Sequence, residues 1–354
     1  MDTRIDNISV IGMAAAVSNN WQSLYDASEE DPALIKKFIK KVGVEGRYAA
    51  GLKQTTSDFC FAAADRILTE KGIDRDKIGV LIFVTQTADY GIPATACVLQ
   101  ARLGLKKDCI AFDVNLGCSG FTYGINIAAT LLNQSDTRYA LLLCGDTSAK
   151  EKSIKARTKT THAASMLFGD SGTATLLEKN DNGQSVLVSS RTDGTGFKAI
   201  ISPYTQWRHP DRPENEAPGT RMDDIAVFSF ATEEATKQIN EYMEKTGSTP
   251  DDYDGLVLHQ ANMMIMKQIA KKTGFTPEKN LISLNRFGNT SSSSIPITLV
   301  YKFGDQKENR ILNVLCCGFG VGLSWSTVAL SIDQADILPL VHTDDYFEDG
   351  YPDE

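Results

Sequence analysis

The sequence predicts an α/β protein built from two similar halves. Residues 78–84 form a continuous apolar run rich in β-branched side chains, which is typical of a strand covered on both faces. Such runs alternate along the chain with amphipathic patterns of helical period, and this alternation indicates layers of helices and sheets. The order helix, acidic turn, strand, helix, strand and polar loop occurs over residues 59–118 and again over residues 228–289. We therefore infer an internal duplication.

The first half is predicted to open on a strand at residues 8–13, where the sequence is apolar and short. Its later elements are, in chain order, a helix at 58–71, a strand at 78–84, a helix at 94–103, a strand at 110–114, a helix at 121–132 and a strand at 139–144. The second half is predicted to contain a helix at 228–245, a strand at 255–259, a helix at 262–272 and a final strand at 324–332.

The organisation that follows is two halves and a tail, at residues 1–180, 181–332 and 333–354. Polar segments at 149–165 and 203–222 lack clear periodicity, so we interpret them as loops inserted between the halves, where function tends to gather. The tail is acidic and follows the last predicted strand, so we expect a solvated end.

Composition and charge place the chain among ordinary globular proteins. It has 354 residues, 42% of them hydrophobic and 23% charged, with a formal net charge of −9. Six of the acidic residues lie among the last eleven positions, so the acidity is mostly a property of the tail. This balance disfavours nucleic-acid binding, which depends on clustered cations, and it gives no support for a broad basic platform.

The cysteines and the first residues bear on localisation. None of the seven cysteines forms a CxxC pair, and each lies among apolar or small residues, so we expect reduced thiols in a cytoplasmic protein. The start of the chain lacks a basic segment followed by an apolar one, and no apolar run approaches about 20 residues. We expect no signal peptide, no membrane span and, from the Cys and His spacings, no metal site.

Cys118 is the first candidate for chemistry. It lies between Gly117 and Gly120 where a strand gives way to a helix, and the N–H dipoles at a helix start lower the pKa of a thiol. A lone cysteine is more often an inert core residue. Two other segments change that balance, because His259 ends a predicted strand and Asn289 lies in a polar loop at the matching place of the repeat. We therefore expect all three side chains to meet at the seam between the halves.

With these residues in place, the chain resembles the thiolase-like condensing enzymes, and most closely the β-ketoacyl-acyl-carrier-protein synthase III family. The resemblance runs from about Ile8 to Ile332. It rests on the motifs Pro93-Ala-Thr-Ala-Cys, Asp113-Val-Asn-Leu-Gly-Cys-Ser-Gly-Phe, Leu167-Phe-Gly-Asp-Ser-Gly, His259-Gln-Ala-Asn, Gly288-Asn-Thr-Ser and Gly318-Phe-Gly-Val-Gly. The resemblance implies a thiolase-like five-layered αβαβα architecture made from two duplicated halves.

The resemblance also implies a reaction. Cys118 would take an acyl group from an acyl-CoA or an acyl-carrier protein, with the N–H groups of Cys118 and Val321 as the oxyanion hole. His259 and Asn289 would hydrogen-bond the thioester carbonyl of malonyl-acyl-carrier protein and stabilise the enolate formed on decarboxylation. The product would be a 3-oxoacyl thioester of fatty acid or related biosynthesis, made without a metal or redox cofactor.

Further residues are implied to bind substrate. These are Ile92, Phe168, Asn262 and Phe319. The family is expected to act as a homodimer in which Ile92 lies near the floor of the partner's acyl pocket. Family members often carry Phe there, so the smaller Ile92 predicts room for a longer or branched chain.

Three docking or clamping features, which involve four positions, depart from the family pattern. An adenine-clamping Trp and Arg are replaced by about Lys37 and His162, Met263 begins the segment where a docking Arg is common, and Ser229 replaces a Lys after Val-Phe. The catalytic trio is retained while the handling of CoA and carrier protein is altered.

Related activities and other classes remain to be weighed. Hydroxymethylglutaryl-CoA synthases and head-to-head condensing enzymes need a Glu base where Gln86 stands, plant-type polyketide synthases usually have Pro at Val321, and no second catalytic Cys is clear for a biosynthetic thiolase. An acyltransferase on the same fold would pass the acyl group to a hydroxyl or amine instead. A papain-like hydrolase lacks its local cysteine signature here, and a non-catalytic partner subunit would not need the complete trio.

Overall fold

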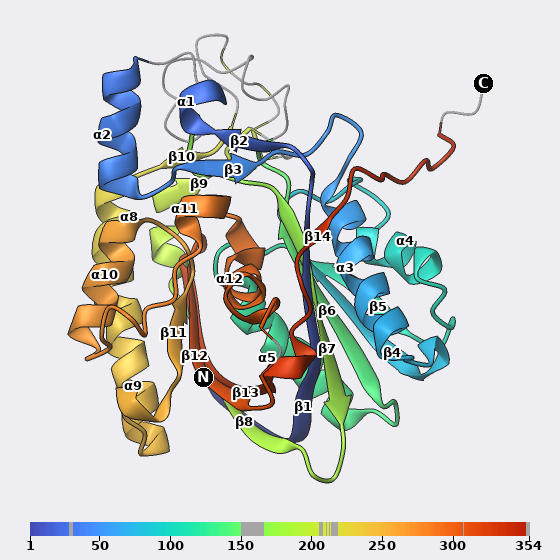
Figure 1. The fold of residues 1–354 in the computed structure, drawn as a ribbon. Helices are drawn as coiled ribbons and strands as arrows, with labels where there is room; N and C mark the ends of the chain where they lie inside the picture. The colour runs from blue at the N-terminus through green and yellow to red at the C-terminus, as the bar shows by residue number, and fades with distance from the viewer. Residues whose placement is uncertain are drawn as a thin grey trace.

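The computed structural model describes residues 1–27, 31–149, 166–204, 208, 209, 211, 213, 219–306 and 308–351 (Figure 1). Nearly all of the predicted loop at 149–165, and much of the one at 203–222, lies outside these residues. Of the described helices, none is both long and apolar enough to cross a membrane.

Two groups of strands, one from each half, form the sheets. The first has the order β5-β4-β6-β7-β1 and comprises β1 (Asp2–Val17), β4 (Ile78–Val84), β5 (Ile110–Val114), β6 (Tyr139–Asp146) and β7 (Ser171–Lys179). The second has the order β11-β12-β13-β8 and comprises β8 (Gln184–Thr192), β11 (Gly255–Leu258), β12 (Ile311–Gly320) and β13 (Ser324–Asp333). Strand β1 joins the groups, because its beginning pairs with β8 and its remainder with β7.

The pairing pattern repeats between the groups. In the first, β4 runs parallel to β6, which is antiparallel to β7, which is antiparallel to β1. In the second, β11, β12, β13 and β8 follow the same sequence of directions. The two groups differ at one edge. In the first group β5 pairs in parallel with β4, whereas in the second group β11 has at this place a single parallel bridge between Leu256 and Asn280. The repeated order is the structural form of the duplication expected from the sequence.

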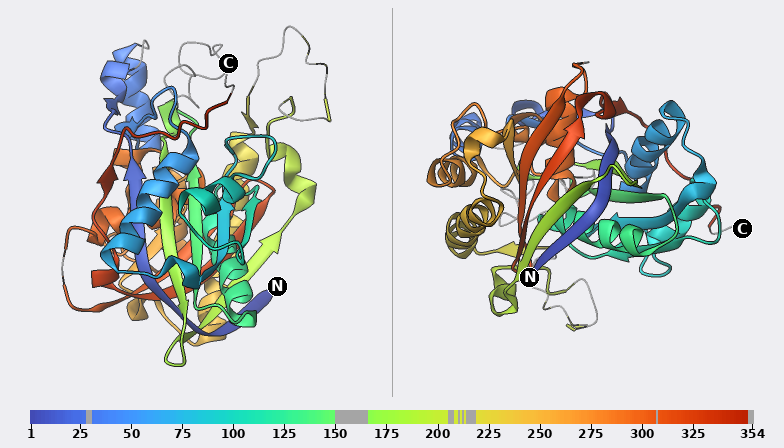
Figure 2. Two further views of the ribbon diagram at one scale, coloured as in Figure 1. Left: turned by 90° about the vertical axis from the view of Figure 1, so that its right-hand side faces the viewer. Right: turned by 90° about the horizontal axis from the view of Figure 1, so that it is seen from below.

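Helices make up the other three layers (Figures 1 and 2). Helices α5 (Gly120–Gln134) and α12 (Ser294–Phe303) lie between the sheets and share one core with both of them. Helices α3 (Thr56–Glu70) and α4 (Thr95–Arg102) cover the outer face of the first sheet, and α9 (Thr236–Thr246) and α10 (Met263–Lys272) cover the outer face of the second. The five-layered αβαβα architecture is therefore confirmed.

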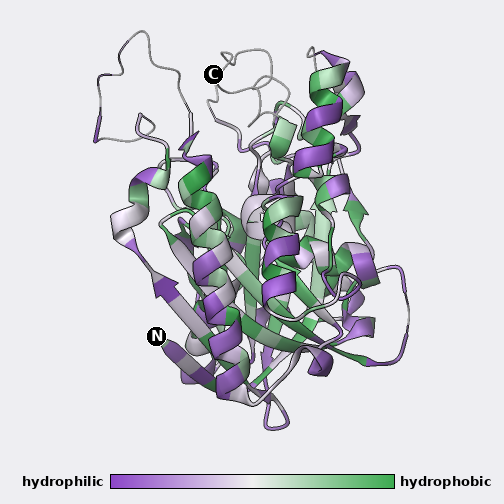
Figure 3. Cartoon of the chain, turned by 90° about the vertical axis from the view of Figure 1, so that its left-hand side faces the viewer, coloured by the Kyte–Doolittle hydropathy of each residue, from purple (hydrophilic) through white to green (hydrophobic). Residues whose placement is uncertain are grey.

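The shorter elements complete the chain. They are β2 (Trp21–Ser23), α1 (Leu24–Ala27), α2 (Pro32–Val42), β3 (Gly46–Tyr48), η1 (Arg75–Lys77), η3 (Gly194–Ala199), β9 (Ile200–Ile201), β10 (Arg221–Met222), α8 (Asp224–Phe230), η4 (Ala231–Ala235), η5 (Pro250–Asp252), α11 (Leu284–Phe287), η6 (Ser291–Ser293), η7 (Gln334–Asp336) and β14 (Val341–His342). The single helix predicted at 228–245 is instead α8 and α9 joined by η4, a π-helical turn. Figure 3 shows hydrophilic residues alternating with hydrophobic ones along the outer helices, as amphipathic packing requires.

The tail is not the solvated end expected from its composition. Strand β14 pairs in parallel with the end of β1, and the N–H of Leu338 donates to Met13. Further on, the N–H of Phe347 donates to Asp58 at 3.0 Å and its ring lies 4.5 Å from the Arg102 guanidinium. Contacts of aromatic and backbone groups therefore hold the described part of the tail against the first half. The net charge of the tail gave no sign of these contacts.

Candidate active site

Cys118 lies in a tight turn between the end of β5 and the start of α5. Backbone from the second half covers it, because a Cβ added at Gly320 would lie 3.0 Å from Cys118 Sγ. On the other side, a Cβ at Gly117 would lie 2.3 Å from Gln86 Oε1. Glycine at these positions lets the two halves close around the thiol.

The thiol is protonated in the resting site. Burial raises the pKa of Cys118 to about 12, and the nearby carboxylate of Asp146 adds to this shift. The nearby N–H groups of Cys118 and Val321 and the hydroxyl of Ser291 lower the pKa and partly offset the shift. The expectation that the helix start lowers the thiol pKa is therefore wrong, because desolvation outweighs the neighbouring donors that lower this pKa.

His259 follows β11 and lies in an apolar setting. Its N–H donates to Cys317 at 2.9 Å, and its ring stands edge-on to Phe319 at 5.6 Å between centroids. Nδ1 lies 2.8 Å from the Ser294 hydroxyl. Burial lowers the pKa of His259 to about 3, with the Ser291 carbonyl partly offsetting the loss, so the imidazole is neutral near pH 7.

Asn289 is fixed by its own backbone and by one side-chain bond. Its N–H donates to Leu167 at 2.8 Å and its carbonyl accepts from Gly169 at 3.1 Å. The side-chain oxygen accepts from the N–H of Ser291 at 2.9 Å, which leaves the amide nitrogen facing His259 Nε2 at 3.5 Å. An N–H donor and an imidazole edge thus converge on one point.

Ser291 lies beside all three side chains and was missed from the sequence. It is buried and has a φ of 54°, a conformation rare for a residue with a Cβ. Its N–H donates to Asn289 Oδ1 at 2.9 Å, its backbone raises the pKa of His259, and its hydroxyl lowers the pKa of the Cys118 thiol. The structure therefore brings Cys118, His259 and Asn289 around a single residue. Its position two residues after Asn289, in a run of serines, was the available signal.

Comparisons with known proteins agree with this geometry. The family model described as 3-oxoacyl-[acyl-carrier-protein (ACP)] synthase III matches residues 112–196, and its C-terminal counterpart matches residues 243–332. The beta-ketoacyl-[acyl-carrier-protein] synthase III of Symbiobacterium thermophilum is 31% identical over 92% of this chain and 98% of its own length. The chain belongs to the 3-oxoacyl-[acyl-carrier-protein] synthase III family.

Two further relatives extend this family assignment. The synthase III of Caldanaerobacter subterraneus is 33% identical over 81% of this chain and 86% of its own length. A 3-oxoacyl-(acyl-carrier protein) synthase from Burkholderia xenovorans LB400 superposes with a TM-score of 0.90 at 30% identity, covering 97% of this chain and 99% of that one. The chain is thus a thiolase-like condensing enzyme of the acyltransferring class.

The other predicted family residues fall in different surroundings. Phe319 packs on His259, and Phe168 forms a parallel bridge with Asn289, so both support the trio directly. The side chain of Asn262 accepts from the N–H of Ile265 at 2.9 Å and caps α10, so its oxygen is already engaged. Ile92 is 89% exposed and contributes to no core of this chain.

The positions that depart from the family pattern are mostly at the surface. Lys37 and Ser229 are exposed, on α2 and α8, and Met263 begins α10. His162 lies outside the described residues.

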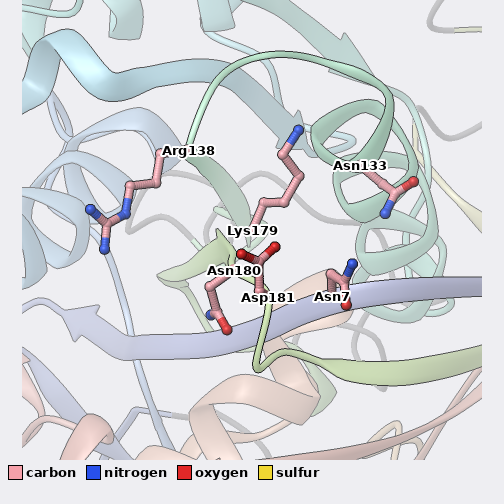
Figure 4. A pocket seen from close by; sticks show the side chains of 6 residues that line it. All are labelled: Asn7, Asn133, Arg138, Lys179, Asn180 and Asp181. Atoms are coloured by element: carbon pink, nitrogen blue, oxygen red, sulfur yellow. The ribbon is translucent and has the colours of Figure 1, made fainter.

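A separate polar pocket lies at the opposite end of α5. It measures about 580 Å³ and is lined by Asn7, Asn133, Arg138, Lys179, Asn180 and Asp181 (Figure 4). Because α5 begins beside Cys118 and rises ~1.5 Å per residue, Asn133 lies roughly 20 Å from the thiol. Arg138 pairs with Glu178 at 2.7 Å and Lys179 donates to the Ser135 carbonyl, so its cations already have partners.

Proposed function

We propose that this chain catalyses a decarboxylative Claisen condensation. An acyl group carried by Cys118 joins the two-carbon unit of a malonyl thioester, with loss of CO2, to give a 3-oxoacyl thioester. The observation that carries the proposal is the convergence of Asn289 Nδ2 and His259 Nε2, 3.5 Å apart, next to Phe319, whose neighbour Gly320 packs against Cys118 Sγ. Two donors at one point are suited to a thioester oxygen that gains charge.

The first half-reaction is acylation of Cys118. The sulfur attacks the carbonyl carbon of an acyl-CoA or acyl-carrier-protein thioester, and the donor's thiol leaves. The N–H groups of Cys118 and Val321, which lie close enough to the sulfur to lower its pKa, are proposed to stabilise the oxyanion that forms beside it.

The second half-reaction uses a neutral imidazole. When the Ser294 hydroxyl donates to Nδ1, the single ring proton of His259 lies on Nε2. Nε2–H and Asn289 Nδ2–H then both donate to the malonyl thioester carbonyl and stabilise the enolate left by loss of CO2. The enolate attacks acyl-Cys118, so the reaction as proposed needs no metal or redox cofactor.

A local cluster of cations supports binding of an anionic donor. Helices α2 and α10 pack together around a groove of about 430 Å³. Their exposed lysines are Lys36, Lys37, Lys40, Lys41, Lys267, Lys271 and Lys272. We propose that lysines of this helix pair receive the phosphates of CoA or an acidic carrier protein, because the two helices carry a local excess of cations that the overall charge of −9 conceals.

A second copy of the chain is the proposed partner at the opposite edge. Strand β5 is the edge of the first sheet, and Ile110 is 53% exposed. The exposed Ile92 lies in the loop before α4, a helix that packs on β5. We propose a cytoplasmic homodimer in which Ile92 lines the partner's acyl pocket, so Ile92→Phe is expected to shorten the preferred acyl chain while trio chemistry persists.

The deciding experiment supplies an acyl-CoA and malonyl-carrier protein and measures CO2 and the product by mass spectrometry. Equal amounts of CO2 and 3-oxoacyl-carrier protein, both absent with Cys118→Ala, are expected. Transfer of the acyl group to a hydroxyl or amine acceptor without CO2 would replace this proposal with the acyltransferase alternative.

A further inference from the structure

The tail ends against the loop that carries Ile92. This β4–α4 loop comprises residues 85–94, and Ile92 is 89% exposed on it. Its first residues hydrogen-bond the buried carboxylate of Asp146. Further on, among the residues that the structure describes, residues 90–93 form one hydrogen bond, from the Tyr90 hydroxyl to a carboxylate of the tail. The part of the loop that presents Ile92 therefore depends on the tail for its hydrogen bonding.

The tail residue that reaches the β4–α4 loop is Asp349. Its Oδ2 accepts from the Tyr90 hydroxyl, 259 positions away in the sequence, and its Oδ1 accepts from the N–H of Tyr351 at 3.0 Å. These hydrogen bonds, the one from Tyr90 above all, lower the pKa of the Asp349 carboxyl, so it is charged near neutral pH. A hydroxyl that donates to a charged carboxylate forms a stronger bond than one between neutral groups, so the contact fixes Tyr90 firmly.

Phe347 anchors the tail two residues earlier. Its N–H donates to Asp58 Oδ1 at 3.0 Å, and its ring stacks on the Arg102 guanidinium at 4.5 Å. Arg102 pairs with the same Asp58 oxygen at 2.9 Å, and because the two side chains are only 10% and 4% exposed, solvent screens this pair little. Arg102 also donates to Ser57 Oγ at 2.8 Å, and that hydroxyl donates to Asp89 Oδ2 at 2.6 Å. One network thus holds both the tail and residue 89 of the β4–α4 loop.

We propose that Asp349 is a positioning residue for the acyl pocket, because it fixes the β4–α4 loop that presents Ile92. The inference rests on the proposed function in placing Ile92 in the partner's acyl pocket. A loop that is held at residue 90 presents the side chain of residue 92 in one place, so the floor of that pocket has a defined depth. When the bond from Tyr90 is lost, the floor moves, and acyl groups longer than the preferred one are accepted.

A tail that only stabilises the fold makes a different forecast, because its loss would leave acyl selectivity unchanged. Asp349→Ala and Tyr90→Phe delete the same hydrogen bond from opposite partners. Both are therefore expected to change selectivity to the same extent, and the double variant is expected to change it no further. Asp349→Asn keeps an oxygen that can accept from Tyr90, so it is expected to restore most of the wild-type selectivity.

Selectivity is measured by loading Cys118 from straight-chain acyl-CoAs of increasing length and following the adduct by intact mass. In Asp349→Ala, the preference for the best acyl-CoA over the next longer one is expected to fall about tenfold, since one methylene group in a pocket is worth roughly 10- to 200-fold in discrimination. Asp344→Ala is the matched control. It removes another tail carboxylate, which accepts instead from Asn19 N at 3.0 Å and Asn19 Nδ2 at 2.7 Å, and selectivity should stay within about twofold of the wild type.

Hydrogen exchange reports on the β4–α4 loop independently of activity. The N–H of Asp89 donates to Thr95 Oγ1 at 3.0 Å, so it is protected while the loop is held. Exchange in a peptide that spans residues 85–94 is expected to quicken in Asp349→Ala and Tyr90→Phe and to stay at the wild-type rate in Asp344→Ala.

Mixed dimers identify the copy whose pocket the tail affects. One copy keeps Cys118, and the other carries Cys118→Ala. Asp349→Ala in the copy without Cys118 is expected to change the selectivity of loading, whereas the same substitution in the copy with Cys118 is expected to leave it unchanged. Unchanged selectivity in the Asp349→Ala enzyme, or a change that follows the copy with Cys118, would overturn the inference. Failure of the wild-type enzyme to load any acyl group would instead overturn the proposed function, and faster exchange in Asp349→Ala would still support the hold of the tail on the loop.

Discussion

The two halves bring strand ends to one site but surround them with opposite electrostatics. The first half places the thiol of Cys118 near an ionisable carboxylate, Asp146, with hydroxyl groups around it. The second half places His259 among Phe319, Ser294 and Asn289, none of which carries charge. A duplicated topology thus supplies one face that holds the nucleophile near a carboxylate and one suited to donating hydrogen bonds from neutral groups. This difference teaches that the acylation and condensation steps have separate machinery.

Removal of the nucleophile is expected to have the largest effect on activity. Cys118→Ala removes the proposed nucleophilic sulfur beside the Val321 N–H, so no acyl adduct is expected, a loss of at least about 1,000-fold. Intact mass after incubation with acyl-CoA measures the adduct. An adduct of unchanged yield would move the acyl group to another residue.

The role of the uncharged hydrogen-bond donors in the second half is tested by removing one of them. His259→Ala or Asn289→Ala is expected to slow CO2 release about 100-fold or more, because one of two donors to the enolate oxygen is lost. Acylation of Cys118 should change only a few-fold. Equal losses in the two steps would make His259 a general base for the thiol and erase the distinction.

The tautomer of His259 offers a smaller test. Ser294→Ala removes the hydroxyl that lies 2.8 Å from Nδ1, so the Nε2–H form loses its support. We expect condensation to slow about tenfold, with acylation unchanged. Thr298→Ser is a conservative companion, because the serine keeps the hydroxyl that donates to the Ser294 carbonyl.

The pH dependence sharpens the contrast. The lowered pKa of His259, about 3, keeps the imidazole neutral at every pH above that value. The rate of CO2 release from pre-acylated enzyme should therefore vary less than about threefold between pH 5 and 8. The raised pKa of Cys118, about 12, means that alkylation should still be rising at pH 10. An inflection near pH 6.5 in CO2 release would show that His259 is exposed and titrates.

Loss of an aromatic contact in the tail, away from Cys118 and His259, is expected to have the smallest effect, and this effect is on stability. Phe347→Ala removes the ring stacked on the Arg102 guanidinium and should lower the free energy of unfolding by about 1 kcal/mol. Tyr351→Ala, at a tail residue that is 88% exposed, is the control and should have no measurable effect. Thermal melts of both variants check this, and a larger loss for Tyr351→Ala would contradict the described packing.

The sequence was sufficient to predict the layered architecture and to predict that Cys118, His259 and Asn289 lie close together. Apolar runs such as residues 78–84 depend on local pattern, and the repeat placed Cys118, His259 and Asn289 at equivalent strand ends. Ser291 and Asp146 depend on a backbone with positive φ and on the approach of β6, which no local pattern encodes. The thiol pKa was misjudged because burial, a tertiary property, outweighs the helix start. The tail was misjudged because its aromatic contacts are not visible in its charge.

Single-turnover kinetics of His259→Ala test the separation of the two half-reactions most directly. Acyl loading of Cys118 and CO2 release are measured separately in this variant and in the wild type. His259→Ala is expected to load acyl groups within a few-fold of the wild-type rate and then release CO2 about 100-fold more slowly. Slowing of acyl loading by a comparable factor would contradict separate machinery for the two half-reactions.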